Sequence, residues 1–557
     1  MSKSMAGIPG YLLVLLVVYV AYGFSLNNEF TYDDIGLVLQ DPRVHNGDWR
    51  GILSQSYWGD KGDGLYRPIT TASLALNWWV CQDRVWGYHL VNLILHSIIG
   101  IMLLYIGRRT EQGKTGLVVA LIYSLHPGPS EAVFSVVGRA ELLACCCGLA
   151  AIICCVRQLQ DSGPGVGWRL GIFIALLCAI LAKENGVVFA SGIVVWRIFL
   201  NSKVDDIGGI AILATVAALA GKWLAIGVFQ PESIGYLDNP LAYESVDSRL
   251  ANAFSLSIRS ALKLIFPYPL VVDYSPQQIP LFAELTMPDV WVPMLLVISL
   301  GGWAVVLMIK RPEYAIWTTL SAGGILLVSN IFVVTGTIFA ERLLYIPALG
   351  FSMALGRLLN RLPARIQISF IASWICIAVS ILWSRGEDWR SDLSLFTSAV
   401  EVHPLSARSH YGLGLALHRE SKLRPALKEY DQALNIYPRY FEARLNRAAV
   451  LLELGKYPDA IAAYRDIVDQ RPRHFQGRYA LALLEFNFGD RSLAKSMLWQ
   501  LHGEFPRRID LLCDLVRLLA GQGNRTEALG LLANGLILEP ANEELLLLQQ
   551  AVNPGVD

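Results

Sequence analysis

Two adjacent carboxylates, Asp33 and Asp34, follow an unbroken apolar run from Tyr11 to Tyr22, within the stretch "NEFTYDDIGLVLQDPRV". A carboxylate can accept the proton of a hydroxyl group that attacks a bound substrate, which is the role of a general base. Ionisable side chains near membrane depth are costly and generally mark functional sites. The position of this pair therefore points to chemistry at the point where the chain leaves an apolar segment.

Further ionisable residues lie at the ends of other apolar segments. They are Arg67, His126, Glu131, Arg139, Glu141, Lys183, Glu184, Glu341 and Arg342. A pocket that combined a carboxylate pair with several cations would suit the transfer of a sugar from a lipid phosphate to a hydroxyl, because Arg and Lys stabilise charge on the departing phosphate. We expect a donor embedded in the membrane, since no nucleotide is available outside the cytoplasm.

The composition indicates a membrane protein. Of 557 residues, 54% are hydrophobic and only 17% are charged, which is unlike a soluble chain of this length. The formal net charge is zero and gives no support to nucleic-acid binding. The nine cysteines include no Cys-x-x-Cys pair and fall mostly within apolar runs, so we expect neither a metal site nor a disulfide framework.

Apolar runs alternate with short loops over the first two thirds of the chain, which predicts a bundle of about eleven transmembrane helices. The predicted spans are 8–26, 88–107, 115–128, 139–156, 168–183, 186–200, 207–228, 291–309, 314–335, 343–360 and 366–384. We interpret the first as a retained anchor, because Asn27 and Asn28 follow it rather than a small-residue cleavage site.

The distribution of Lys and Arg predicts the orientation of these spans. Arginines such as Arg108, Arg109, Arg357 and Arg361 gather in alternate loops, which are expected to be cytoplasmic. The amphipathic segment 250–266 contains charges and is interpreted as lying on the outer membrane surface. With that assignment, Asp33 and the C-terminal half face away from the cytoplasm.

The C-terminal third has a 34-residue period. Prolines at 404, 438, 472, 506 and 540 and alanines at 426, 460, 494 and 528 recur at this spacing, which is typical of tetratricopeptide (TPR) repeats. The small residue allows two helices to approach closely, and the proline ends the second helix. We predict a transmembrane domain over 1–387 and a TPR solenoid over 388–550, consisting of a half repeat and four full repeats.

Several motifs together carry a resemblance to a known family. They are "YDD" after the first span, "YRPITTASLALN", "GYHLVNLILH", "HPGPSEAVFSVVGRAELLA", "LAKENGVV", "PYPLVVDYS" and "ERLLYIPALGF". In this order, and with TPR repeats attached, the chain resembles the transmembrane and TPR-containing O-mannosyltransferases of the GT-C glycosyltransferase class. The resemblance covers nearly the whole chain.

The resemblance implies an inverting, metal-independent transfer of mannose or another hexose from a polyprenyl-phosphate sugar to a protein hydroxyl. It implies Asp33 as the base and Asp34 as its partner at the acceptor or donor, with Arg139 and Arg342 as candidates for the donor phosphate. From the residues themselves we add Lys183 as a third candidate for that phosphate. A bacterial inner membrane with a C55-type polyprenol is the expected setting, or the endoplasmic reticulum with a luminal TPR domain if the source is eukaryotic. The TPR domain is expected to bind the protein acceptor.

The same residues also allow structural interpretations. Asp33 and Asp34 could start a solvated loop or cap a helix, and Arg67 could anchor to lipid head groups. His126 could cap a helix end. Glu131 could pair with Arg139 or order the pocket. Lys183 and Glu184 could snorkel to the interface, and Glu341 could form a structural pair with Arg342.

Two further functional classes can be compared with a glycosyltransferase. A non-catalytic membrane scaffold that recruits partners through its TPR repeats would need only one span, whereas charges stand at the ends of many. A transporter or lipid flippase should have broken helices or inverted repeats, with charges near the midplane of the membrane, whereas the charges here lie towards one face. The sequence therefore favours a glycosyltransferase.

Overall fold

In the residues described by the structure, a computed structural model, helices are the only regular secondary structure, apart from one isolated bridge between Ser56 and Gly59. The described residues are 8–59, 64–110, 114–160, 165–201, 203–229, 233–274 and 277–553. The chain divides into two compact units, Met1–Ser409 and His410–Asp557. The all-α fold predicted from the sequence is confirmed.

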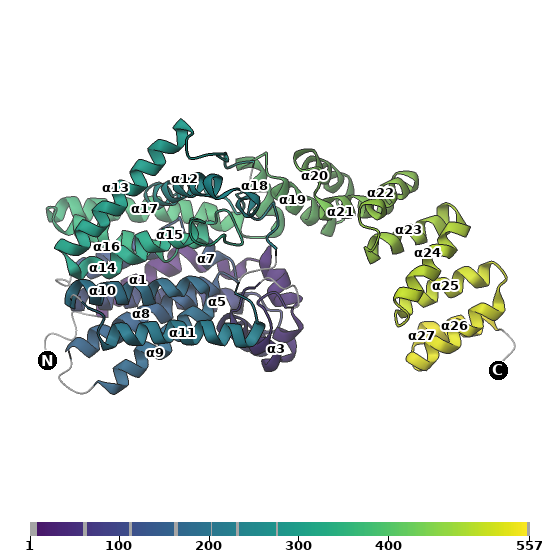
Figure 1. Cartoon of the computed structure of the whole chain (residues 1–557), viewed down its shortest axis with the longest axis horizontal. Helices are drawn as coiled ribbons and strands as arrows, with labels where there is room; N and C mark the ends of the chain where they lie inside the picture. Colours follow the sequence, from purple (N-terminus) through teal and green to yellow (C-terminus); the bar gives the residue numbers. More distant parts are fainter. Residues whose placement is uncertain are drawn as a thin grey trace. The chain divides into compact units, whose positions relative to one another are not determined.

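The first unit is a bundle of helices, drawn in purple to green in Figure 1. Its helices are α1 (Ile8–Tyr22), α2 (Pro42–Asn46), α3 (Trp49–Ser54), α4 (Pro68–Cys81), α5 (Trp86–Thr110), α6 (Lys114–Ser124), α7 (Glu131–Phe134), α8 (Arg139–Gln160), α9 (Val166–Ala182), α10 (Val187–Asn201), α11 (Asp206–Ile226), α12 (Val246–Ile265), α13 (Pro288–Lys310), α14 (Ala315–Thr318), α15 (Gly324–Val328), α16 (Pro347–Asn360), α17 (Ala364–Asp388) and α18 (Asp392–Val402).

Each predicted span overlaps a helix of this bundle. Within the described residues, six segments are long and apolar enough to cross a membrane: Gly10–Asn27, which is most of α1 with the turn after it, and helices α5, α8, α11, α13 and α17. Helices α6 and α9 are apolar but shorter. The chain is therefore a multi-pass membrane protein, while the total of about eleven spans stays a prediction.

The predicted span 314–335 is shorter in the structure. It consists of α14, a π-helical turn (Thr319–Gly323) and α15, which ends at Val328. Asn330 has a positive φ of 67°, and its side-chain oxygen accepts hydrogen bonds from the backbone N–H of Thr335 at 2.9 Å and from the Thr335 hydroxyl at 3.0 Å. An Asn side chain that satisfies nearby backbone groups favours a loop over a further helical turn.

Helix α12 contains most of the amphipathic segment 250–266. It is not among the six segments above. The carbonyl of Leu264 in its last turn accepts a hydrogen bond from His126, and Ser248 in its first turn donates to the carbonyl of Phe282. Small or polar residues such as Ala251 and Ser257 form its buried face. Its placement on the membrane surface stays a prediction.

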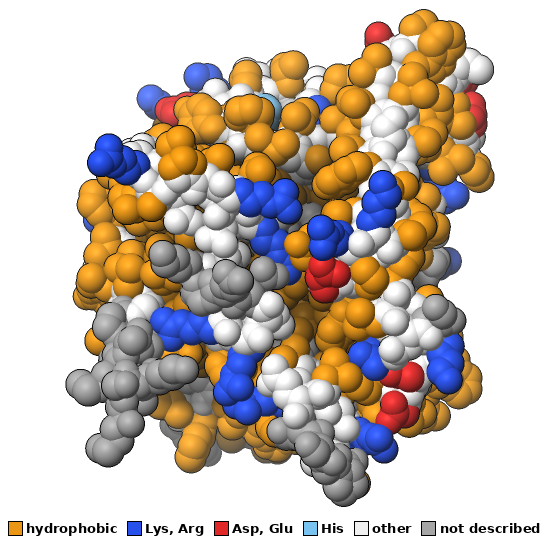
Figure 2. Space-filling view, turned by 90° about the vertical axis from the view of Figure 1, so that its left-hand side faces the viewer, with side chains coloured by type: hydrophobic (Ala, Val, Ile, Leu, Met, Phe, Trp, Pro, Cys, Tyr) orange, Lys and Arg blue, Asp and Glu red, His pale blue; other side chains and the backbone are white. Residues whose placement is uncertain are grey.

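The basic clusters meet at the end of the bundle where α1 begins. Arg108 of α5 stacks on Tyr11 of α1 at 4.8 Å, and Arg169 of α9 pairs with Asp206 of α11 at 2.6 Å. Figure 2 shows this end of the bundle, where Lys and Arg side chains gather on an apolar surface with few Asp or Glu. The gathering of cations at one end agrees with the sequence pattern that predicted the orientation.

The second unit is a TPR solenoid. It contains four helix pairs and a final helix, and the first three residues of its first helix lie before the unit boundary. These helices are α19 (Ala407–Arg419), α20 (Leu423–Ile436), α21 (Phe441–Glu453), α22 (Tyr457–Gln470), α23 (Phe475–Phe488), α24 (Arg491–Glu504), α25 (Ile509–Gly521), α26 (Arg525–Leu538) and α27 (Glu543–Val552). The first helices of the four pairs begin at Ala407, Phe441, Phe475 and Ile509, which follows the predicted 34-residue period.

The packing of the repeats follows from their periodic residues. Buried Tyr430 fills the space beside Gly414, where an added Cβ would lie 2.7 Å from the Tyr ring. Tyr464 takes the equivalent position in the second repeat, and buried Leu498 and Leu532 take it in the third and fourth. An apolar side chain at this position therefore keeps the core of every repeat filled although the aromatic residue is lost.

The boundary between the units differs from the predicted one. The sequence placed it between residues 387 and 388, where α17 is about to end. In the structure, α18 and the first residues of α19 belong to the first unit, which extends to Ser409. The predicted half repeat, which is α18, is therefore part of the membrane unit.

Candidate active site

A cavity of about 770 Å³ lies in the first unit, and Asp33 is among the residues that line it. Its polar wall carries five cations, which are Arg67, Lys183, Lys222, Arg342 and Arg408, and four carboxylates, which are Asp33, Glu184, Asp238 and Asp273. Apolar residues from α11, α15 and the loop after α15, such as Leu219, Val328 and Val333, line another part of the cavity. The cavity therefore combines a charged region with an apolar one.

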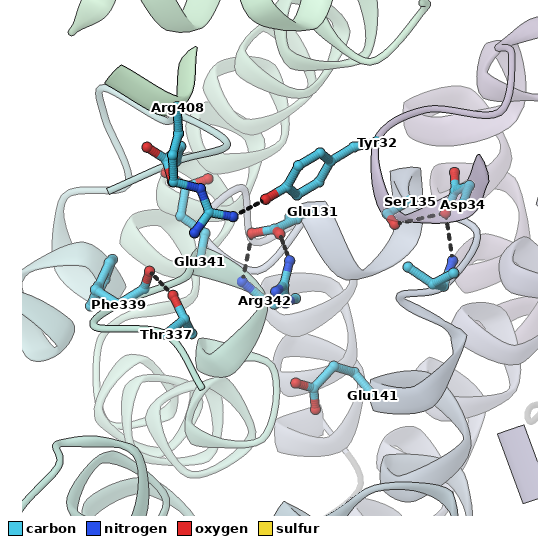
Figure 3. A network of polar contacts seen from close by, with 12 residues as sticks. Tyr32, Asp34, Glu131, Ser135, Glu141, Thr337, Phe339, Glu341, Arg342 and Arg408 are labelled. Atoms are coloured by element: carbon cyan, nitrogen blue, oxygen red, sulfur yellow. Dashed lines mark hydrogen bonds and ion pairs between the residues drawn. The ribbon is translucent and has the colours of Figure 1, made fainter. Parts of the chain in front are cut away.

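The two adjacent carboxylates have different environments. Asp33 is half-buried and lines the cavity, and no described residue donates a hydrogen bond to it. Asp34 is fully buried and points the other way, towards Ser135 (Figure 3). Of the predicted pair, only Asp33 is therefore available to a substrate.

Asp34 holds the backbone that carries Asp33. Its carboxylate accepts hydrogen bonds from the backbone N–H groups of Thr31 at 3.2 Å, Val136 at 3.3 Å and Val137 at 2.9 Å, and from the Ser135 hydroxyl at 3.2 Å. These donors join the turn after α1 to the segment before α8. We therefore assign Asp34 a structural role rather than the predicted contact with acceptor or donor.

Charges of both signs surround Asp33. Burial raises the pKa of the Asp33 carboxyl, the positive charges of Arg342 and Arg408 act against this rise, and Glu131 and Asp238 add to it. A general base works best when its pKa is near the operating pH, so a raised pKa makes a carboxylate a better base at neutral pH. Asp33 therefore has both the access and the environment of a general base.

Arg342 is held beside this base by Glu131. The Arg342 guanidinium donates to one Glu131 oxygen at 2.7 Å, and the Arg342 backbone N–H donates to the other at 3.0 Å (Figure 3). Glu131 is fully buried, whereas the Arg342 side chain is 27% exposed and lines the cavity. Glu131 thus orders the pocket, and the pairing with Arg139 that its sequence position allowed is not formed.

Glu341 pairs with Arg385 of α17 rather than with Arg342. Its carboxylate accepts from Arg385 at 3.2 Å, from the Tyr274 hydroxyl at 2.6 Å and from the backbone N–H of Val271 at 2.7 Å. Adjacent residues in the 3-10 turn Glu341–Leu344 point in different directions, which separates Glu341 from Arg342. Glu341 joins α17 to the segment after α12 and supports the cavity wall from outside.

A second charged group combines Arg67, which directly precedes α4, with residues of the turn after α9. Arg67 donates to Glu184 at 3.0 Å, and its guanidinium lies 4.8 Å from the Tyr57 ring. Lys183 donates to the fully buried Glu141 of α8, and Asn185 donates to the other Glu141 oxygen at 2.7 Å. Arg67, Lys183 and Glu184 all line the cavity, as predicted for pocket residues.

Arg139 lies outside this cavity lining. Its side chain is fully buried, and it donates to Asn92 at 3.0 Å, to Asn77 at 2.8 Å and to the carbonyls of Ser73 and Tyr88. These neutral acceptors tie α4, α5 and α8 together and occupy the guanidinium. The geometry thus supports a structural role for Arg139 and not the predicted phosphate contact.

His126 is also structural. Its Nδ1 accepts from the backbone N–H of Gly128 at 3.1 Å, which makes Nε2 the donor to the Leu264 carbonyl at 2.8 Å. The ring is buried and packs against Phe351 and Trp374. His126 thus fastens the loop after α6 to the end of α12, in line with the structural interpretation of its sequence position.

Sequence reasoning missed several residues of the cavity wall. Asp238 and Asp273 lie in the long segment between α11 and α13, Lys222 is on α11, and Arg408 lies in the first turn of α19. Asp273 stands in "PYPLVVDYS", which the resemblance had already marked, so this motif was a usable signal. Arg408 was missed because the domain boundary was placed ahead of it.

Comparisons with known proteins agree with the two-part organisation. A tetratricopeptide repeat family model matches residues 385–441, 419–475 and 445–494. The chain is 27% identical to protein O-mannosyl-transferase F38B6.6 of Caenorhabditis elegans, over 78% of this chain and 64% of that protein. It is 25% identical to protein O-mannosyl-transferase TMTC3 of Homo sapiens, over 80% of this chain and 53% of that protein. The chain thus spans between half and two thirds of the relatives that it matches.

Two solved structures are also similar in part. ArnT from Cupriavidus metallidurans, solved with undecaprenyl phosphate, gives a TM-score of 0.37 at 13% identity, over 90% of this chain and 80% of ArnT. The oligosaccharyltransferase of Archaeoglobus fulgidus, solved with an acceptor peptide, gives 0.38 at 13% identity, over 74% of this chain and 59% of that enzyme.

Proposed function

We propose that this chain transfers a hexose from a polyprenyl-phosphate sugar to the hydroxyl of a protein Ser or Thr. The names of its relatives suggest that this hexose is mannose. The observation that carries the proposal is Asp33, a cavity-lining carboxylate to which no described residue donates a hydrogen bond and which faces Arg342 and Arg408. The relatives named as protein O-mannosyl-transferases support the choice of reaction.

The proposed step is a single displacement at the anomeric carbon. The acceptor hydroxyl oxygen forms a bond to this carbon while Asp33 takes the hydroxyl proton, and the bond from the carbon to the phosphate oxygen breaks. The electron pair of that bond leaves with the polyprenyl phosphate. Because attack and departure occur on opposite faces, the configuration at the anomeric carbon inverts.

Cations of the cavity would bind the phosphate and the charge that develops on it. Arg342 and Lys183 are kept from the sequence prediction, and Lys222 is added because it lines the cavity near the apolar residues of α11. Apolar residues such as Leu219 and Val328 would hold the first part of the polyprenyl chain. Metal independence stays a prediction, and the described residues contain no group of three or more His, Cys, Asp or Glu that could hold a metal ion.

The orientation and the compartment are part of the proposal. The basic end of the bundle would face the cytoplasm, and the cavity and the TPR repeats would face the opposite side. A bacterial inner membrane is the setting that we favour. The TPR repeats would present an extended surface to a protein acceptor, which raises the local concentration of hydroxyls near the base.

Asp33→Asn tests this function because it removes the proton acceptor at nearly constant shape. In membranes with equal amounts of inserted protein, transfer of labelled mannose from a synthetic polyprenyl-phosphate mannose to protein should fall by at least about 100-fold. Asp83→Asn, which changes an exposed carboxylate away from the cavity, is the matched control and should transfer normally. Unchanged transfer by Asp33→Asn would overturn the assignment.

A further inference from the structure

The residue before the proposed base has an unusual backbone conformation. Tyr32 has a positive φ of 53°, in the left-handed region that a bulky aromatic residue rarely adopts. This conformation is strained for a residue with a Cβ and persists only where the surroundings determine it. The contacts of Tyr32 therefore decide where Asp33 points.

Helix α18 supplies two of these contacts. The Tyr32 backbone N–H donates to the Asp392 carboxylate at 2.8 Å, and the Tyr32 ring packs edge-on against Phe396 at a centroid distance of 5.7 Å. The neighbouring Glu29 N–H donates to the carbonyl of Arg390 at 2.9 Å. The turn that carries Asp33 is thus fixed to the segment that follows the last transmembrane helix.

Arg408 in the first turn of α19 supplies the third contact. Its guanidinium donates to the Tyr32 hydroxyl (Figure 3). It also donates to Asp238, and its Nε lies 3.4 Å from Asp273. The side chain is 22% exposed and lines the cavity together with Tyr32, Asp33, Asp238 and Asp273. Two carboxylates and one hydroxyl therefore hold Arg408 beside the base.

We propose that Arg408 and Tyr32 are positioning residues for Asp33, so that the first turn of the first TPR helix forms part of the active site. This inference rests on the proposed function. The planar guanidinium can hold the Tyr32 hydroxyl and the two carboxylates at once, a geometry that Lys cannot reproduce. Arg408 also provides one of the two positive charges that face Asp33.

Three variants separate the geometric and the electrostatic roles. Arg408→Gln removes both the positive charge and the planar guanidinium. Arg408→Lys keeps the positive charge and loses the planar guanidinium, and Tyr32→Phe removes the hydroxyl alone. Each should lower kcat by about 10-fold or more at an unchanged KM for the lipid-linked sugar, because misplacement of a reacting group by about 1 Å can cost about 100-fold. Arg390→Gln, which removes an exposed arginine of the same segment, is the matched control.

The pH profile distinguishes this role from a general structural one. The ionisable groups that interact electrostatically with Asp33 are Arg342, Arg408, Glu131, Asp238, Asp34, Tyr32 and Tyr57. Because Arg408 lowers the Asp33 pKa, its loss should raise that pKa and move the acid limb of kcat/KM to higher pH. The limb should move in Arg408→Gln and stay in place in Arg408→Lys and Tyr32→Phe.

Each outcome has a defined meaning. If Arg408→Gln and Tyr32→Phe behave like Arg390→Gln in both kcat and pH profile, the positioning role is wrong, including when Asp33→Asn is inactive. If Asp33→Asn remains active, the proposed function itself fails. A loss in Arg408→Gln that is accompanied by misfolding is resolved by the milder Tyr32→Phe, whose unaltered kcat would overturn the proposal.

Discussion

Two sets of charged residues, one at each end of the membrane bundle, are held in different ways. Where α1 begins, Arg169 and Asp206 form an ion pair in which both side chains are about half exposed, and Arg108 lies over the Tyr11 ring. At the end with the cavity, Glu131 and Glu141 are fully buried and each holds a cavity-lining cation in place. An exposed ion pair costs little free energy to form, whereas a buried charge costs the free energy of removing it from water.

The free-energy cost of burying charges therefore falls at the end of the bundle that contains the cavity. A topology signal needs only positive charge near the membrane surface, and solvent-exposed arginines supply it. A buried carboxylate that fixes a cation at a cavity wall is justified when the cation must be oriented towards a substrate. Substitutions at the two ends should therefore differ in their effect on activity.

Glu131→Gln should have the largest effect. It leaves Arg342 without its charged partner, and breaking a buried pair generally destabilises a protein by about 3–5 kcal/mol. We expect at least a 100-fold loss of sugar transfer and a lower midpoint of thermal unfolding in detergent. Full activity in this variant would mean that the orientation of Arg342 does not matter.

Arg139→Lys should have an intermediate effect and act on stability only. A lysine cannot satisfy the four neutral acceptors that surround the guanidinium, and each buried acceptor left unpaired costs about 1–3 kcal/mol. The unfolding midpoint should fall while KM for the lipid-linked sugar is unchanged among the molecules that remain folded. A raised KM at unchanged stability would restore the phosphate contact predicted from the sequence.

Arg169→Gln should have the smallest effect. The ion pair with Asp206 is exposed, so its removal should change stability by about 0–1 kcal/mol and leave sugar transfer at the level of the unaltered chain. Measurement of both quantities in the same membranes as Glu131→Gln gives the direct comparison of the two ends. A loss as large as that of Glu131→Gln would remove the distinction between them.

Contacts between residues that are close in the sequence could be predicted, whereas contacts between distant residues could not. The TPR repeats could be predicted because Pro438 and Ala426 act within their own repeat, and helix positions followed from local apolar runs. Glu131 and Arg342 are separated by 211 residues, and no local pattern selects this partner over Arg139. Likewise, nothing in "YDD" tells which carboxylate faces the cavity, because the donors to Asp34 come from Ser135, Val136 and Val137.

The position of the unit boundary after Ser409 has a consequence for how such chains can diversify. Asp392, Phe396 and Arg408 all precede it, so a chain cut near Arg390 would lose every contact that these residues make with Tyr32. Duplication or deletion of 34-residue blocks beyond that point would change the reach of the array and leave those contacts intact. Under the proposed function, a change in repeat number could alter the choice of protein acceptor and leave the residues around Asp33 unchanged.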